Sequence, residues 1–123
     1  MTGMRAKTGA AARVWGAATA AVGAAALLRP RTVAEAVSGG GAAPDPAVVR
    51  VLGGRQLLQG TAVLIRPAPL FVIGGVAVDV LHATSMVAAA VIWPGYRRAA
   101  LTSAAVAGAS AAAGALILRG ARR

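Results

Sequence analysis

Residues 75–86 read GVAVDVLHATSM, and they place an aspartate, the only histidine and a serine inside the most hydrophobic segment of the chain. A carboxylate in such a segment is costly in lipid unless another group partners it. The stretch therefore predicts a membrane-embedded helix whose polar side chains face a neighbouring helix.

The composition points to the same environment. Hydrophobic residues make up 58% of the 123 residues, the mean hydropathy is +0.70, and only 13% of the residues are charged. A water-soluble domain carries about 25% charged residues. The chain is therefore expected to be a single integral membrane domain, with the lipid bilayer as its solvent.

Several site chemistries are excluded by residue counts. The chain has no cysteine, one histidine and three acids, Glu35, Asp45 and Asp79. This set cannot supply the ligands of a zinc or di-iron site, so neither a metal nor another cofactor is expected. The net charge of +10 comes from arginines grouped between apolar runs, as lipid headgroups favour, so nucleic acid is not expected as a partner.

Apolar runs separated by basic and turn-forming residues predict an all-α fold, a four-helix transmembrane bundle. The expected spans are residues 10–28, 47–65, 70–93 and 99–118, with basic tails at 1–13 and 119–123 and a loop at 29–46. Arg66-Pro-Ala-Pro69 is a very short connection. It predicts that the second and third helices form a tight antiparallel hairpin.

The first apolar run has a second interpretation. A basic start, an apolar middle and Ala34-Glu35-Ala36 resemble a secretory signal peptide with its cleavage site. Arg29-Pro30-Arg31 argues against cleavage because processing signals are rarely basic directly after the apolar run. A retained helix is favoured, and cleavage would leave three spans.

Charge bias favours a topology with both termini on the cytoplasmic side of the cytoplasmic membrane. The basic residues expected on that side are Arg5, Lys7, Arg13, Arg66, Arg119, Arg122 and Arg123. Those expected on the opposite side are Arg29, Arg31, Arg97 and Arg98. Trp93 and Tyr96 fit the aromatic belt at that outer interface.

Counting across the short connection places Arg55 and Asp79 at the same depth, because each lies twelve residues from Pro67. Helical periodicity puts Gln59 on the same face as Arg55, and His82 and Gly75 on the same face as Asp79. The sequence thus predicts a buried polar cluster of Arg55, Gln59, Asp79 and His82. Gly75 is expected to leave room for a bulky neighbour.

Three further polar residues are secondary candidates for this cluster. Arg50 is rotated by about 140° from Arg55 and is expected to reach the outer headgroups or to meet the fourth helix. Gln56 faces the level of residue 78. Ser85 could complete a catalytic triad with Asp79 and His82, but it lies about 120° around the helix from Asp79 and no oxyanion donor accompanies it. No catalytic residue, and no enzyme, is therefore expected.

Small residues recur every four positions in the first and last apolar runs. The rows are Ala12, Gly16, Ala20 and Ala24 in the first run, and Ala100, Ala104, Gly108 and Ala112 in the last. Such rows let helices approach closely in lipid. Gly16, Ala20, Ala104 and Gly108 are therefore the predicted packing positions, towards a membrane-protein partner or a second copy of the chain.

Residues 50–59 (RVLGGRQLLQ) together with residues 79–86 (DVLHATSM) resemble small uncharacterised four-span membrane proteins of actinobacteria. A looser resemblance exists to DoxX-type four-helix membrane families. These resemblances imply location and architecture but no activity.

Two functions are consistent with these expectations. The first is a structural or accessory membrane component, in which the Arg–Asp pair fixes the packing of two helices. The alternative is a small proton-coupled carrier or ligand-binding membrane protein that uses Asp79 and His82.

Overall fold

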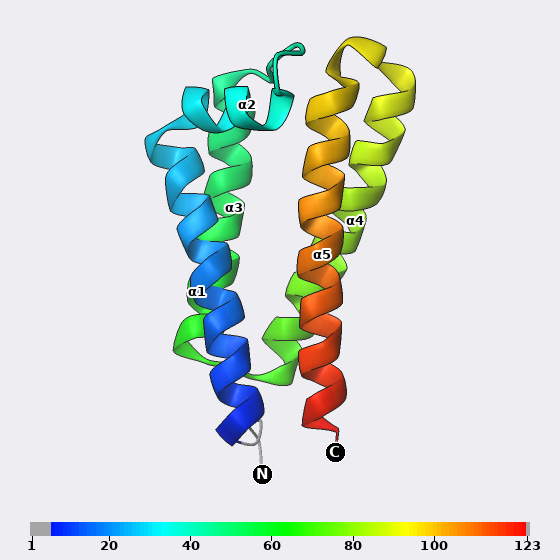
Figure 1. Cartoon of the computed structure of the whole chain (residues 1–123). Coiled ribbons are helices and arrows are strands. Elements are labelled where there is room, and N and C mark those ends of the chain that lie inside the picture. The colour runs from blue at the N-terminus through cyan, green and yellow to red at the C-terminus, as the bar shows by residue number, and fades with distance from the viewer. Residues whose placement is uncertain (1–5, 123) are drawn as a thin grey trace.

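A computed structural model describes residues 6–122, which contain helices and no strand. The elements in chain order are α1 (Ala6–Leu28), α2 (Pro30–Ser38), α3 (Pro46–Ile65), α4 (Pro69–Ile92), the short 3-10 helix η1 (Pro94–Tyr96) and α5 (Arg97–Ala121). The long helices run along one axis, and α1 begins at the same end at which α5 finishes (Figure 1). Helix α2 lies across the opposite end, beside the turn between α4 and α5.

The predicted four-helix transmembrane bundle is wrong. The described residues form five α-helices, and only three segments are long and apolar enough to cross a membrane: Ala6–Leu28, Pro69–Ile92 and Pro94–Ala121. Helix α3 is not among them, because two arginines and two glutamines lower its hydropathy.

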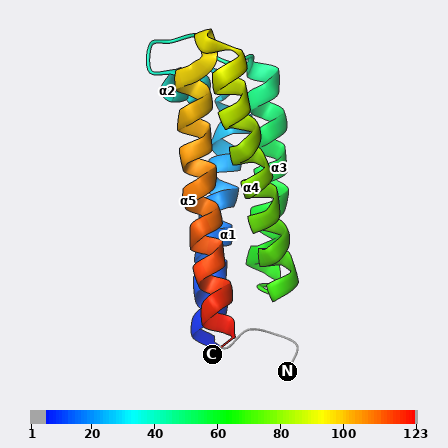
Figure 2. The same cartoon turned by 90° about the vertical axis from the view of Figure 1, so that its right-hand side faces the viewer.

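The tight hairpin between the second and third predicted helices is also wrong. Helices α3 and α4 are joined by the short segment 66–68 and run antiparallel, but α3 packs mainly on α1 and α4 packs mainly on α5. The structure therefore consists of two helix pairs, α1/α3 and α4/α5, which stand side by side (Figures 1 and 2). A short connection fixes relative depth, but it does not decide which helix is the closest neighbour.

The close approach of α1 and α3 depends on two facing pairs of glycines. Gly16 lies opposite Gly60, and Gly23 lies opposite Gly53. A Cβ atom on Gly16 would lie 2.8 Å from the carbonyl oxygen of Gly60, and one on Gly23 would lie 2.5 Å from that of Gly53. Backbones in such direct contact gain dispersion and exclude lipid, which is how small residues stabilise helix pairs in membranes.

This seam occupies the face that the sequence predicted for partner binding on the first helix. Gly16 is buried and a Cβ on Gly60 would contact Ala20, so both predicted residues pack inside the chain. On α5 the buried small residues are Ala99, Ala100, Ala107, Ala111 and Gly114. Ala104 is only half-buried, and Gly108 is exposed with open space beside it.

Helix α2 replaces half of the predicted loop at 29–46, so that prediction is wrong over Pro30–Ser38. Pro30 suits the first turn of a helix because its missing N–H would have no partner there. The buried side chain of Ala34 packs with Ala26 and Val49, which anchors α2 on the α1/α3 pair. Gly39 ends the helix at φ 51°, a left-handed conformation that glycine adopts readily.

The end of α2 is also fixed by the other helix pair. Arg98, at the start of α5, donates from Nη1 to the carbonyl oxygen of Gly39 at 2.7 Å. The contact ties α2 to the α4/α5 pair at the end of the molecule opposite the chain termini.

We predict that Gly60→Ala destabilises the protein by about 1–3 kcal/mol, because the new methyl group would collide with the backbone of α1. Gly54→Ala on the same helix is the matched control, since a Cβ there has nothing within 4 Å. The control should keep its stability or gain up to about 1 kcal/mol from helix propensity. Unfolding followed by circular dichroism in detergent measures both. Equal stability of the two variants would contradict the glycine seam.

Candidate functional site

Arg55 on α3 and Asp79 on α4 bring the two helix pairs into contact. Arg55 Nη1 lies 3.8 Å from Asp79 Oδ1, and the side chains are 27% and 5% exposed. This distance allows an ion pair but is too long for a hydrogen bond. Counting across residues 66–69 predicts that Arg55 and Asp79 lie at the same depth, and the structure places them level with each other.

The polar groups of this cluster are incompletely satisfied. Arg55 Nη1 donates to Gln59 Oε1 at 3.1 Å, as one turn of helix allows. Arg55 Nε, Gln59 Nε2 and Asp79 Oδ2 are buried among the described residues without a hydrogen-bond partner. Buried polar groups in folded proteins are almost always paired, so three such atoms in one place call for an explanation.

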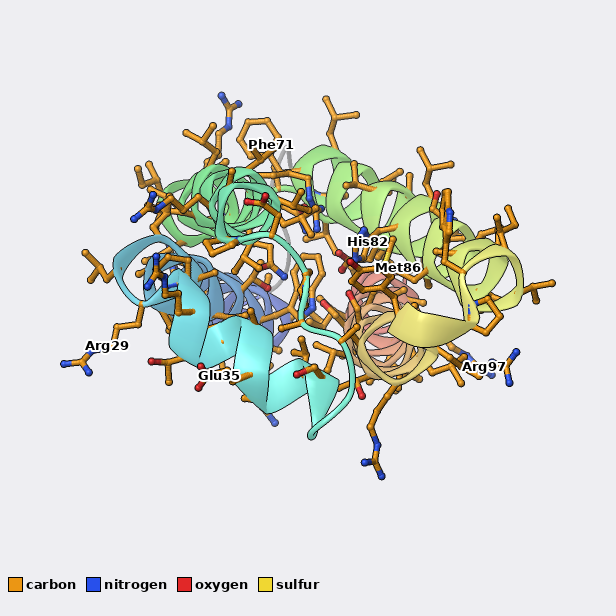
Figure 3. The ribbon with its side chains drawn as sticks, turned by 90° about the horizontal axis from the view of Figure 1, so that it is seen from above. Arg29, Glu35, Phe71, His82, Met86 and Arg97 are labelled. Carbon is orange, nitrogen blue, oxygen red and sulfur yellow. The ribbon has the colours of Figure 1, made fainter. Side chains whose placement is uncertain are left out.

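The position of His82 predicts Asp79 as its neighbour, but the structure gives it a hydrogen-bond partner on α5. Its Nε2 lies 2.8 Å from Ser103 Oγ on α5, a hydrogen bond within the α4/α5 pair. His82 is directed towards the middle of the assembly, whereas Arg29 and Arg97 extend away from it (Figure 3). The structure therefore places His82 beside the Arg55–Asp79 contact and bonds it to α5.

The secondary candidates separate from one another. Arg50 is exposed on α3. Ser85 is exposed and donates to the carbonyl oxygen of Leu81 at 2.8 Å, so it does not join Asp79 and His82 in a triad. Gln56, in contrast, lines a cavity together with Asp79.

Trp15 joins α1 to the α4/α5 pair, and no pattern in the sequence singles it out. Its Nε1 donates to Ser110 on α5, with the carbonyl oxygen and Oγ each at 3.1 Å. A Cβ on Gly75 would lie 2.7 Å from the indole ring, and one on Gly114 would lie 3.1 Å from it. Trp15 is thus the bulky neighbour for which Gly75 leaves room.

A cavity of about 200 Å³ lies between the two helix pairs, next to Trp15. Its walls are Trp15, Ala18, Thr19, Val22, Gln56, Asp79, Val106, Ala107 and Ser110. Apolar atoms make up most of its surface.

Within residues 6–122, no group of three or more histidine, cysteine, aspartate or glutamate side chains could hold a metal ion. Arg55 and Gln59 form a hydrogen bond at this site, and Arg55 and Asp79 form an ion pair.

Comparison with protein-family models, with curated proteins and with solved structures finds no match to this chain. The resemblance of residues 50–59 and 79–86 to small actinobacterial membrane proteins therefore stays a prediction.

We predict that Gly75→Ala changes the environment of Trp15, because the added methyl group would overlap the indole ring and Gln59. Trp93→Phe provides the background, since it leaves Trp15 as the only tryptophan. The emission maximum of Trp15 should then shift to longer wavelength as the ring moves out of its buried position. Gly74→Ala is the matched control, because open space surrounds that position. Equal shifts in the two variants would contradict the packing of the Trp15 ring against Gly75 and Gly114.

Proposed function

We propose that this chain is a structural or accessory component of the cytoplasmic membrane, in which a buried Arg–Asp contact fixes how two helix pairs stand against each other. The observation that carries the proposal is the 3.8 Å approach of Arg55 and Asp79 across those pairs. A charged pair between packed helices disfavours other registers, because every other register would leave a charge buried and unmatched.

Membrane location is supported by three segments long and apolar enough to cross a bilayer. It is also supported by the side chains that face outwards. Large apolar residues are widely exposed, among them Leu28 at 81%, Leu58 at 76%, Val51 and Val91 at 73%, and Leu81 at 69%. A protein in water rarely exposes apolar surface on this scale, whereas lipid solvates it at no cost.

The proposed topology keeps both termini on the cytoplasmic side of the plasma membrane, and the proposed source remains actinobacterial. The support is that α1 begins and α5 finishes at one end of the molecule, and that Lys7 and Arg119 lie in the turns of those helices at that end (Figure 1). We also propose that α1 is retained, because its loss would remove Trp15 and the glycine seam with α3.

A partner protein, or a second copy of this chain, is proposed to pack on the outer face of α5. Gly108 is exposed there and has open space around it. An accessory role needs such a free face, since the small residues of α1 are already packed against α3.

The alternative, a proton-coupled carrier that uses Asp79 with His82, has less support from the geometry. His82 is hydrogen-bonded to Ser103, and Asp79 approaches Arg55. What favours the alternative is Asp79 Oδ2, which is buried and has no hydrogen-bond partner within residues 6–122.

We predict that Asp79→Asn and Arg55→Gln each reduce accumulation in the membrane, while the double variant recovers it. Each single change leaves one charge unmatched, which costs up to about 3 kcal/mol, the low end for buried pairs because Arg55 is 27% exposed. Immunoblots of membrane fractions and thermal unfolding measure the effect. Arg50→Gln, an exposed arginine of the same helix, is the control and should accumulate normally. A double variant no better than the worse single one would refute a pairing role.

The topology predicts which single cysteines are labelled from outside the cell. The chain has no cysteine of its own, so Ala43→Cys, Tyr96→Cys and Ala121→Cys each introduce one thiol. Positions 43 and 96 are exposed at the end that carries α2 and η1, whereas position 121 is at the end with the termini. A membrane-impermeant maleimide should label the first two in intact cells, and the third only after lysis. Labelling of positions 43 and 121 from the same side is the contrary result.

A further inference from the structure

An open cleft of about 540 Å³ lies at the end of the molecule that carries α2, between the loop after α2 and the start of α5 (Figure 1). Its wall includes Gly41, Gly95, Arg97, Arg98, Leu101 and Thr102. The volume is within the range of about 300–1,000 Å³ that is typical of small-molecule sites. The cleft is separate from the cavity beside Trp15 and shares no wall residue with it.

Two neighbouring arginines of this cleft are held in place by backbone carbonyl groups. Arg97 Nε donates to the carbonyl oxygen of Ala90 at 3.3 Å, and Arg98 Nη1 donates to that of Gly39 at 2.7 Å. A guanidinium group has five N–H donors, so each arginine keeps donors for a ligand. Because both side chains are already held, a ligand would have to order them less on binding.

The positive charge of the two arginines is not balanced within the described chain. Among residues 6–122, neither Arg97 nor Arg98 lies within ion-pair distance of a carboxylate. Asp45 instead accepts from the backbone N–H of Ala47. Both arginines are exposed, so their remaining donors are open to an outside molecule. Guanidinium groups match the geometry of phosphate oxygens, which makes phosphate the anion that fits best.

The position of the cleft indicates that the phosphate belongs to a lipid. The cleft lies at the turn between the candidate spans Pro69–Ile92 and Pro94–Ala121. Trp93 and Tyr96 in the same turn are 58% and 47% exposed, as side chains of an interfacial aromatic belt are. Leu101, one helical turn beyond Arg97, is 46% exposed and adds an apolar surface to the wall. Lipid headgroups lie at this depth, with their chains on the side of the spans.

We propose that this cleft binds the headgroup of an anionic phospholipid, whose phosphate accepts from Arg97 and Arg98 and whose apolar part lies against Leu101. A zwitterionic headgroup fits less well, because its cationic amine would come close to two guanidinium groups. The inference depends on the membrane location proposed above. It does not depend on the accessory role or on which side the termini face, since both leaflets have headgroups. Membrane fractionation tests the location separately from this binding site.

Native mass spectrometry of the full chain in a non-ionic detergent measures the binding of individual lipids. The probe is dioctanoyl phosphatidylglycerol, and dioctanoyl phosphatidylcholine is the matched zwitterionic probe. The first phosphatidylglycerol should bind with a Kd at least about tenfold lower than that of phosphatidylcholine, because each arginine near an anionic headgroup contributes a factor of several. Inorganic phosphate in excess should not displace it, since phosphate has no apolar part to contact Leu101.

Arginine variants locate the binding. Arg97→Gln combined with Arg98→Gln should reduce the ratio of the two Kd values to about one. Arg31→Gln is the matched control and should leave the ratio unchanged, because Arg31 is an exposed arginine of α2 that does not line the cleft. Circular dichroism and size-exclusion profiles check that the variants fold.

A second pair of variants leaves both arginines and their hydrogen bonds in place. Gly95 lies in the cleft wall, and a Cβ on it would have nothing within 4 Å, so a new side chain there begins in open space. Gly95→Glu adds a carboxylate that competes with the lipid phosphate for the guanidinium groups, and it should abolish the preference for phosphatidylglycerol. Gly95→Gln has nearly the same shape without the charge and should keep most of the preference.

Four results would overturn the proposal. They are equal Kd values for the two lipids, an equal loss of preference in Arg31→Gln and in the double variant, equal behaviour of Gly95→Glu and Gly95→Gln, and displacement of the lipid by inorganic phosphate. The last result would mean that the cleft takes a free phosphate rather than a lipid headgroup.

Discussion

The contact between Arg55 and Asp79 is the constraint on which the rest of this structure depends. Asp79 lies within a helix that is otherwise apolar enough to cross a membrane, and only 5% of its side chain is exposed. A carboxylate in that position needs an opposite charge, which α3 brings to within 3.8 Å. The arginine that pairs with Asp79 lies on α3, and it lowers the hydropathy of that helix.

Around this contact the molecule is held in two tight pairs that touch at few points. Glycines let α1 and α3 pack backbone to backbone, while small residues and the His82–Ser103 bond join α4 to α5. Between the pairs, Trp15 fills the space above Gly75 and Gly114. Space remains between the pairs beside Trp15, and the cavity lined by Asp79 occupies it.

The depth relation between Arg55 and Asp79 could be predicted from the sequence, because a short turn fixes which residues of two antiparallel helices lie level. The room beside Gly75 could be predicted from its place on the Asp79 face. Neither argument identifies which helices pack against each other. Helix α3 packs on α1 because Gly53 and Gly60 match Gly16 and Gly23.

In a chain so rich in alanine and glycine, rows of small residues occur on several faces, so spacing alone does not select the packed one. That is why Gly108 was expected to pack and is exposed, and why Ala107 and Ala111 are buried instead. Trp15 and Ser110 lie 95 positions apart, and no local pattern connects them. Helix α2 was missed although its nine residues are amphipathic, because Arg29-Pro30 before it and the glycine run after Ser38 are typical of a loop.

Solid-state nuclear magnetic resonance in lipid bilayers tests the central contact most directly. In an Asp45→Asn variant, Asp79 is the only aspartate, so its carboxyl carbon can be labelled with ¹³C while all arginines carry ¹⁵N. The structure predicts dipolar dephasing of that carbon by a guanidinium nitrogen, in keeping with the 3.8 Å between Nη1 and Oδ1. The dephasing should disappear in Arg55→Gln. A carboxyl signal that shows no dephasing with Arg55 present would contradict the pairing of Arg55 and Asp79.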